Sequence, residues 1–244
     1  MIEKLNDHDG RLTRRESLVK LGGLAATVFG AGAWGTRELL TAPDADAAGA
    51  GPAAVSSGLL TCVLTPEMTE GPYYVEGDKV RRNVTEGKPG VPLTLLLTVV
   101  DVSTCRLVKG AAMDIWHCDA GGVYSETTQQ STEDLTFLRG IQRTDKNGVA
   151  SFKTIYPGWY TGRAVHIHVK VYLGGRTVHT GQLFFPDTLT DAVYKRSPYT
   201  KRGDRDTRNA DDSIFRNGGR RSLLKLTKSG TGYVGRMTMG VARS

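Results

Sequence analysis

Apolar and polar residues alternate in short runs along most of the chain, which is the pattern of β-strands that bury one face. The first run, residues 93–102, is strongly apolar, and the next, residues 111–118, alternates between the two kinds. Further runs of strand-like sequence lie at residues 137–144, 148–154, 164–171, 177–185, 213–215, 222–227 and 233–238. Strands at such short spacing predict an all-β fold, a β-sandwich of mostly antiparallel strands with few or no long helices.

Turn-forming residues predict how two of these runs connect. Asn147 and Gly148 form a dipeptide typical of tight turns, so we expect residues 137–144 and 148–154 to pair as a hairpin. The charge-rich stretch 186–208 is expected to be a loop.

The segment from residue 156 to residue 170 holds the most chemically suggestive residues. Side chains alternate along a strand, so His166 and His168 point to the same side, about 7 Å apart, close enough to bind one metal ion. Tyr160 lies in the Gly- and Pro-rich loop before this strand, and Arg163 lies next to its start. Two histidines on a strand face are also a common hydrogen-bonded or solvated feature, so the pair alone leaves a metal site undecided.

The composition is that of a globular protein rather than of a nucleic-acid-binding one. The 244 residues are 39% hydrophobic and 23% charged, which leaves enough apolar surface for a sizeable core. The net charge of +7 comes from scattered Lys and Arg rather than from a basic groove interleaved with aromatic residues. We therefore expect no nucleic-acid partner, and an anionic substrate or acidic surface explains the charge equally well.

The N-terminal segment has the features of an export signal. Arg14 and Arg15 precede a mildly apolar run that is too weak for a transmembrane helix and is typical of a twin-arginine signal. The sequence therefore predicts a signal peptide at 1–47, a flexible linker at 48–60 and one folded domain at 61–244. We expect the mature protein to be extracellular or in the cell envelope, without a membrane span. An uncleaved anchor and lipid or wall attachment stay open.

Three cysteines allow at most one internal disulfide. Cys62 and Cys105 both lie in loop-like sequence beside predicted strands, and an oxidising destination permits a bond, so we predict that they pair. Cys118 is then a small buried thiol.

Four motifs in order resemble the intradiol ring-cleaving dioxygenases, the family of the catechol and protocatechuate dioxygenases. They are T-E-G-P-Y-Y at 69–74, D-I-W-H-C-D-A-G-G-V-Y-S at 114–125, P-G-W-Y-T-G-R-A-V-H-I-H at 157–168 and G-Q-L-F-F-P at 181–186. Each motif is weak by itself, and the four in this order are specific. The resemblance covers most of the chain after the predicted signal.

The resemblance implies one mononuclear non-haem Fe(III) ion, bound by Tyr124, Tyr160, His166 and His168 with solvent as a further ligand. Phenolate oxygens are hard anionic ligands, and two of them favour trivalent iron over softer ions. An ordinary tyrosine has a pKa near 10, and contact with a metal cation is what ionises it at neutral pH.

The reaction implied by the resemblance is cleavage of a catechol-type aromatic diol by O2 between the two hydroxylated carbons, which gives a cis,cis-muconate type of diacid. The diol would bind iron through both oxygens and displace Tyr160, which leaves the ring electron-rich enough to react with O2. Arg163 would stabilise negative charge on the ring, and Gln182 would position the substrate or oxygen. Pro72 and Tyr73 would form walls of the substrate pocket.

Two other functions fit parts of the sequence. A non-catalytic β-sandwich that binds ligands or cell-wall polymers would share the fold, but it would have little reason to keep the two tyrosines, the two histidines and Arg163 together. A divalent-metal hydrolase is disfavoured because no carboxylate in the motif strands is placed as a general base. We interpret His117 as structural and expect His179 to make a local hydrogen bond. The ring substituents of the substrate stay open, as does assembly into a homo-oligomer.

Overall fold

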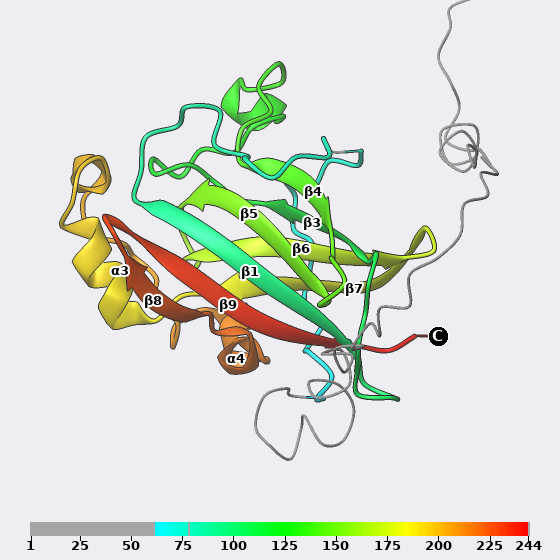
Figure 1. The fold of residues 1–244 in the computed structure, drawn as a ribbon. Helices are drawn as coiled ribbons and strands as arrows, with labels where there is room; N and C mark the ends of the chain where they lie inside the picture. The colour runs from blue at the N-terminus through cyan, green and yellow to red at the C-terminus, as the bar shows by residue number, and fades with distance from the viewer. Residues whose placement is uncertain (1–61, 78, 244) are drawn as a thin grey trace, which may run out of the picture. The chain divides into compact units, whose positions relative to one another are not determined.

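The alternating runs form strands of two β-sheets in the computed structural model, which describes residues 62–77 and 79–243 (Figure 1). Sheet A contains β1 (Pro92–Asp101), β2 (Arg106–Leu107), β5 (Val149–Ile155), β8 (Lys225–Ser229) and β9 (Gly232–Val241). Sheet B has the strand order β4 (Arg139–Arg143), β3 (Ala112–Trp116), β6 (His166–Leu173) and β7 (Arg176–Phe184). The predicted all-β class with short helices is confirmed.

Strand pairing is antiparallel with one exception among the named strands. Strand β9 runs parallel to β1 over its length, from the pair Leu93–Tyr233 to the pair Asp101–Val241. The other paired strands are antiparallel. The sandwich is therefore mostly antiparallel, as predicted, with a parallel pair in the middle of sheet A.

Alternation along the strands builds the core between the two sheets. The alternate residues of β1 and of β6 are buried in one apolar cluster, which includes Leu93, Leu95, Leu97, Val99, Ile167, Val169 and Val171. Burial of one such side chain contributes roughly 1.5–3 kcal/mol relative to leaving it exposed. Because successive side chains alternate, His166 and His168 lie on the outer face of sheet B, away from this core.

The predicted hairpin between residues 137–144 and 148–154 is wrong. The turn itself forms, because the Asp145 carboxylate accepts hydrogen bonds from the N–H groups of Asn147 and Val149, both at 2.9 Å. However, β4 pairs with β3 and β5 pairs with β1, so the turn passes the chain from sheet B to sheet A. Turn residues specify a local reversal of the chain, whereas apolar packing decides which partner each strand finds.

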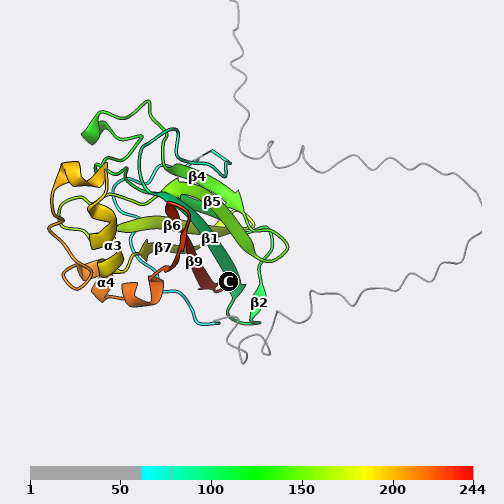
Figure 2. The same ribbon diagram turned by 60° about the vertical axis from the view of Figure 1, so that its left-hand side comes forward.

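Two segments expected to be loop or strand contain helices. Residues 186–208 include α3 (Asp187–Tyr194), and the predicted strand 213–215 lies in α4 (Ser213–Arg216). Both helices lie beside the sheets, and Figure 2 shows them on the same side. Three-residue to four-residue 3-10 turns occur at Thr128–Gln130, Tyr199–Arg202 and Gly219–Ser222. A run as short as Ser-Ile-Phe is too brief for its apolar period to separate helix from strand.

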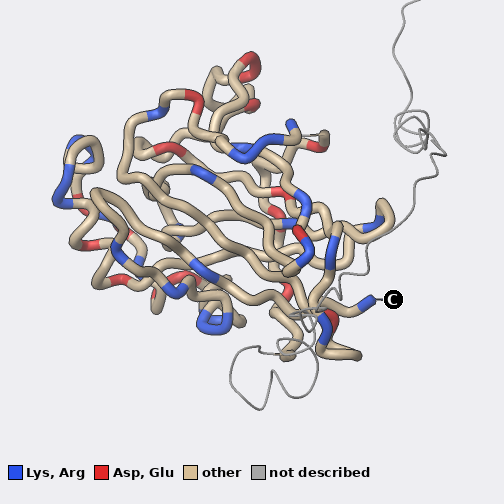
Figure 3. The backbone as a smooth tube through the Cα atoms, in the orientation of Figure 1, with Lys and Arg blue, Asp and Glu red and all other residues tan. Residues whose placement is uncertain are grey.

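The structure joins Cys62 to Cys105, whose Cα atoms are 5.4 Å apart, and Cys118 is a buried free thiol. Lys and Arg are spread over strands and loops and interspersed with Asp and Glu (Figure 3). Among the described residues, no helix has both the length and the apolar content needed to cross a bilayer. The predicted signal and linker, 1–47 and 48–60, lie outside the described residues.

Candidate metal centre

Four polar side chains converge on the outer face of sheet B. His166 Nε2 lies 3.0 Å from His168 Nε2 and 3.1 Å from the Tyr160 hydroxyl oxygen. The ring of Tyr124 lies against those of Tyr160 and His168, with centroid separations of 5.7 and 6.3 Å. These are the four residues that the sequence predicted as ligands of one metal, and strand β6 and two loops bring them together.

Strand β6 holds the two histidines firmly because it pairs with β3 on one edge and β7 on the other. Trp116, the residue opposite His168 on β3, stacks on the His168 ring at 4.9 Å with 7° between the planes. Gly71 approaches the same ring, and a Cβ added there would lie 3.2 Å from His168 Cε1. The backbone φ of Gly71, +72°, is also one that glycine adopts more easily than other residues. The glycine of motif 69–74 therefore lets this segment close over the histidine.

Tyr124 is held through both its backbone and its ring. Its N–H donates to the Gln130 side-chain oxygen at 2.6 Å, and its carbonyl accepts from the Thr132 hydroxyl at 2.7 Å. Tyr73 stacks on the ring at 4.3 Å. The side chain is fully buried, so the position of its hydroxyl is set by packing.

The loops that carry the two tyrosines pack backbone against backbone. A Cβ at Gly122 would lie 2.3 Å from the Trp159 carbonyl oxygen, so any side chain at this position would push the loops apart. The Gly158 N–H donates to the Asp119 carbonyl at 3.0 Å across the same contact. The double glycine before Tyr124 therefore allows the two phenols to meet.

Burial keeps the four groups neutral when no cation is present. It raises the pKa of Tyr160 to about 12 and the pKa of Tyr124 well above its ordinary value. It also lowers the pKa of His166 to about 3 and the pKa of His168 well below its ordinary value. His166 Nδ1 lies 2.6 Å from the Ala164 carbonyl oxygen, so Nδ1 carries the proton and Nε2 presents its lone pair to the cluster.

Two observations show that a cation fits this cluster. The lone pair on His166 Nε2 is approached by His168 Nε2, the Tyr160 hydroxyl and Arg163 Nη1, which are more potential donors than one lone pair can satisfy. The Tyr124 hydroxyl is buried without a hydrogen bond of normal geometry among the described residues. Two phenol oxygens with two imidazole nitrogens form a donor set suited to trivalent iron. In the described part of the chain no three His, Cys, Asp or Glu side chains converge, so a metal here depends on the tyrosines.

Arg163 lies beside the cluster and contacts it directly. Its Nη1 donates to the Tyr160 hydroxyl at 3.3 Å, and its Nη2 donates to the side-chain oxygen of Gln182. Gln182 in turn donates to the Thr69 carbonyl at 2.9 Å. Arg163 and Gln182, the two residues predicted to act on the substrate, therefore lie at one edge of the cluster.

Asp212 is a neighbour of the site that the sequence motifs did not indicate. Its buried carboxylate accepts from Arg163 Nε and from the Ala164 N–H, both at 2.9 Å. Burial raises the pKa of this carboxyl, but the hydrogen bonds from Ala164 and Arg163 outweigh that effect and hold the pKa below its ordinary value. Asp212 is therefore a buried anion beside the site cation. An Asp before Ser-Ile-Phe is typical of a helix N-cap, and this is the only feature of the local sequence that points to a role for Asp212.

The predicted wall residues Pro72 and Tyr73 line a cleft of about 390 Å³. One side is formed by residues 72–75 and the other by residues 126–129 with Glu133. Tyr73 also stacks on Tyr124, so the ring of Tyr73 lies between this cleft and the cluster. A larger cavity, of about 580 Å³, lies beside α3 and is lined by none of the four clustered side chains.

His117, interpreted as structural, and His179, expected to make a local hydrogen bond, are both buried. His117 Nδ1 lies 2.8 Å from the Cys118 carbonyl oxygen, and its Nε2 lies 2.7 Å from the Thr154 hydroxyl. His179 Nε2 has no hydrogen-bond partner among the described residues, so the expected local bond is not made at that nitrogen.

The buried His117 predicts a loss of stability in acid. Burial lowers its pKa to about 4 from an ordinary value of 6.5, so the folded protein takes up this proton later than the unfolded chain as the pH falls. The free energy of unfolding is then fully retained above pH 6.5 and declines towards pH 4, with His117 accounting for roughly 2–3 kcal/mol. Urea unfolding of iron-free protein at pH 7 and pH 4.5 checks this. The His117→Gln variant is expected to show a decline smaller by that amount, and equal declines would contradict the assignment.

Comparison with known proteins places the chain in a family. A family model described as "Dioxygenase" matches residues 69–197, just over half of the chain, and this range includes all four clustered side chains. In sequence, the chain is 31% identical to catechol 1,2-dioxygenase 1 of Acinetobacter lwoffii over 101 residues. That alignment covers 39% of this chain and only 32% of the relative.

Solved structures resemble the chain over a greater length. An intradiol ring-cleavage dioxygenase from Tetranychus urticae matches with a TM-score of 0.70 and 34% identity, over 74% of this chain and 95% of that chain. The dioxygenase domain of a dioxygenase carbohydrate-binding protein fusion from Streptomyces sp. SirexAA-E matches with a TM-score of 0.59 and 32% identity, over 75% and 100%. These matches agree with the four sequence motifs and the fold that carries them, and the chain therefore belongs to the intradiol ring-cleaving dioxygenases.

Proposed function

We propose that the protein is an exported non-haem Fe(III) enzyme that cleaves catechol-type aromatics with O2 between the two hydroxylated carbons. The observation that supports this proposal best is the convergence of Tyr124, Tyr160, His166 and His168 beside Arg163. These four side chains would hold one iron ion. When bound, Fe(III) supplies Lewis-acid activation of the diol, so that the ring can react with O2.

The two tyrosines differ in ways that suit different tasks. Tyr124 is fully buried, whereas Tyr160 is partly exposed and its hydroxyl accepts a hydrogen bond from Arg163. Tyr160 is therefore the ligand that an incoming diol would displace, and its oxygen can take up a proton from the diol. Tyr124, held by stacking with Tyr73, would stay in place.

Arg163 and Gln182 would act on the bound substrate. The guanidinium charge stabilises negative charge that develops on the ring, and such preorganised charge is a large contribution to catalysis. Gln182 is held at both ends of its amide, by Arg163 and by the Thr69 carbonyl, so it presents a fixed hydrogen-bonding group to a ligand. The reaction balances without a reductant, because both oxygen atoms of O2 enter the diacid product.

The cleft beside Tyr73 predicts which diols are preferred. Its lining contains the carboxyl side chains of Glu133 and of Glu126, which pairs with the buried Arg139 at 3.2 Å, and no Lys or Arg. A carboxylate on the substrate ring would face these groups in the cleft, so we expect catechol to be cleaved with a kcat/KM about tenfold or more above that of a ring-carboxylated catechol. Oxygen uptake across a panel of substituted catechols measures this ratio. Equal or inverted preference would contradict the assignment of the cleft as the substrate entrance.

Two measurements test the proposed function itself. Purified protein loaded with ferric iron is expected to absorb visible light through tyrosinate-to-iron charge transfer and to consume O2 when catechol is added. A colourless protein that cannot be loaded with iron would refute the proposal. Binding of aromatic ligands without O2 uptake would favour the non-catalytic binding module instead.

The export part of the proposal rests on Arg14 and Arg15 in the predicted signal 1–47, which lies outside the described residues. A reporter protein fused after residue 47 is expected to leave the cytoplasm only while both arginines are present. Export of a reporter with lysine at both positions would count against a twin-arginine signal.

A further inference from the structure

We infer that Asp212 is a positioning residue, which fixes the Arg163 guanidinium against the cluster of tyrosines and histidines; this inference rests on the proposed function. Asp212 lies 49 residues after Arg163 in the sequence and belongs to none of the four motifs. Among the described residues its carboxylate makes hydrogen bonds to Arg163 and to backbone N–H groups but to none of the four clustered side chains, so beyond the effect of its charge on His166 it acts on the cluster through Arg163.

Both carboxylate oxygens of Asp212 are occupied. Oδ2 accepts from Arg163 Nε and from the Ala164 N–H, each at 2.9 Å. Oδ1 accepts from the N–H groups of Ile214 and Phe215 at 2.7 and 3.2 Å, which makes Asp212 the N-cap of α4. One buried carboxylate thus joins the first turn of α4 to the arginine and to the segment that leads into β6.

Anchoring Nε determines where the rest of the guanidinium points. The group is planar, so a fixed Nε leaves Nη1 and Nη2 little freedom. Here Nη1 reaches the Tyr160 hydroxyl and Nη2 reaches Gln182. Without Asp212 the long side chain would have other rotamers available, and its charge would no longer be held where the substrate ring is expected to bind.

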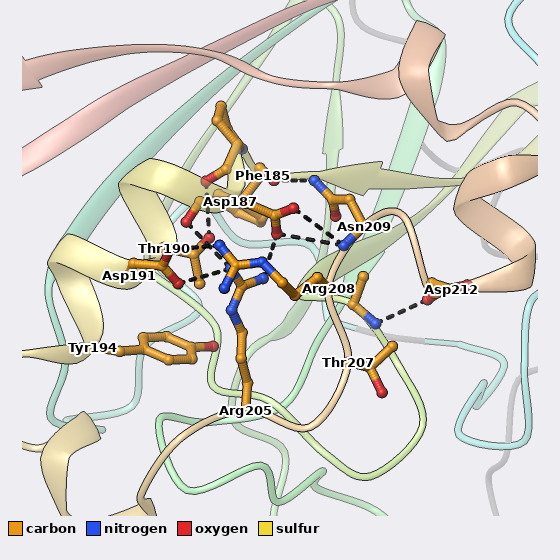
Figure 4. A network of polar contacts seen from close by, with 12 residues as sticks. Phe185, Asp187, Thr190, Asp191, Tyr194, Arg205, Thr207, Arg208, Asn209 and Asp212 are labelled. Carbon is orange, nitrogen blue, oxygen red and sulfur yellow. Dashed lines mark hydrogen bonds and ion pairs between the residues drawn. The ribbon is translucent and has the colours of Figure 1, made fainter.

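The stretch that carries Asp212 is itself tied to α3. Arg205 pairs with both Asp187 and Asp191 of that helix, and the Asn209 side chain donates to a backbone carbonyl just after β7 at 2.8 Å (Figure 4). Strand β7, which carries the glutamine partner of the arginine, leads directly into α3. Arg163 therefore lies between the stretch that carries Asp212 and the strand that carries Gln182, and α3 connects the two. This arrangement supports a positioning role for Asp212.

A purely structural role would give Asp212 only the task of capping α4. The two roles are separated by a double-mutant cycle in the full iron-loaded chain, with Asp212→Asn, Arg163→Met and the double variant. Asn is as good an N-cap as Asp, but it carries no charge, and its NH2 group would face the N–H groups of Arg163 and Ala164. The matched control is Asp211→Asn, which makes the same charge change at an exposed neighbour and should leave kcat unchanged.

We expect Asp212→Asn to lower kcat for catechol about 10- to 100-fold, the scale of a misplaced catalytic group. In the double variant the loss should equal that of Arg163→Met alone within about threefold, because Asp212 then has nothing to position. Losses that multiply in the double variant, or a wild-type rate in Asp212→Asn, would overturn the inference.

A crystal structure of iron-free Asp212→Asn gives a second readout that does not depend on activity. Arg163 is expected to lose its contact with Gln182, and an unmoved guanidinium would also overturn the inference. If Asp212→Asn fails to fold, Asp212→Ser keeps a capping oxygen and takes its place in both experiments. A wild-type protein that binds no iron would instead refute the proposed function, and the position of Arg163 in the variant would still test this inference.

Discussion

Replacing Tyr124 with Phe is expected to abolish iron binding and to lower kcat/KM by about a thousandfold or more, while the iron-free protein becomes more stable than wild type by about 1–3 kcal/mol. The Tyr124 hydroxyl is fully buried and has no hydrogen bond of normal geometry among the described residues. Its removal therefore takes away a buried polar group that costs about 1–3 kcal/mol when left unsatisfied, and it leaves the stacking on Tyr73 intact.

Iron content by elemental analysis and urea unfolding of the iron-free protein check the two halves of this expectation. Tyr156→Phe is the matched control, because this tyrosine is equally buried but its hydroxyl lies 2.8 Å from that of Thr190, outside the cluster. It should keep iron and lose about 1 kcal/mol of stability. A Tyr124→Phe protein that retains iron and activity would show that this hydroxyl is not a ligand.

Replacing Arg163 with Met is expected to lower kcat about 100- to 1,000-fold, because the charge that would stabilise the developing anion is lost. The same change should lower the free energy of unfolding by about 2–4 kcal/mol, since the buried Asp212 carboxylate loses its partner. Steady-state oxygen uptake and urea unfolding measure the two effects in one preparation.

Arg202→Met provides the control for this variant. Arg202 is exposed and lies over the Trp159 ring at 4.5 Å, and it donates to the Gly121 carbonyl at 2.6 Å, so it contacts both tyrosine loops but lies outside the cluster. It should leave kcat within about twofold of wild type and change stability by less than about 1 kcal/mol. An equal loss of kcat in both variants would mean that the effect of Arg163 comes from the loss of one positive charge anywhere near the site, rather than from its position beside the cluster.

How much of the site could be foreseen depends on how local its signals are. The alternation of β6 was enough to place His166 and His168 on one face, because strand geometry fixes that from neighbouring residues alone. The addition of Tyr124 and Tyr160 came from motif resemblance, since nothing in strand period says that two separate loops will meet. Asp212 could not be linked to Arg163 by either route, because their contact depends on the packing of α4 against the start of β6.

In the fold, too, features set by neighbouring residues could be predicted, whereas features set by packing between distant segments could not. The apolar runs predicted the strands, but the turn at Asn147 and Gly148 did not reveal that β4 and β5 would enter different sheets. Partner choice arises from packing across the core, and a turn of four residues contains no information about it. The helix α4 was missed because three residues cannot display a helical period.

The parallel pairing of β1 with β9 bears on how the protein is made. Strand β1 precedes the other named strands in the sequence, yet its parallel neighbour β9 is the last of the strands that the structure describes. Sheet A therefore closes only after β9 has been made, and until then one edge of β1 has open hydrogen-bonding groups that favour aggregation.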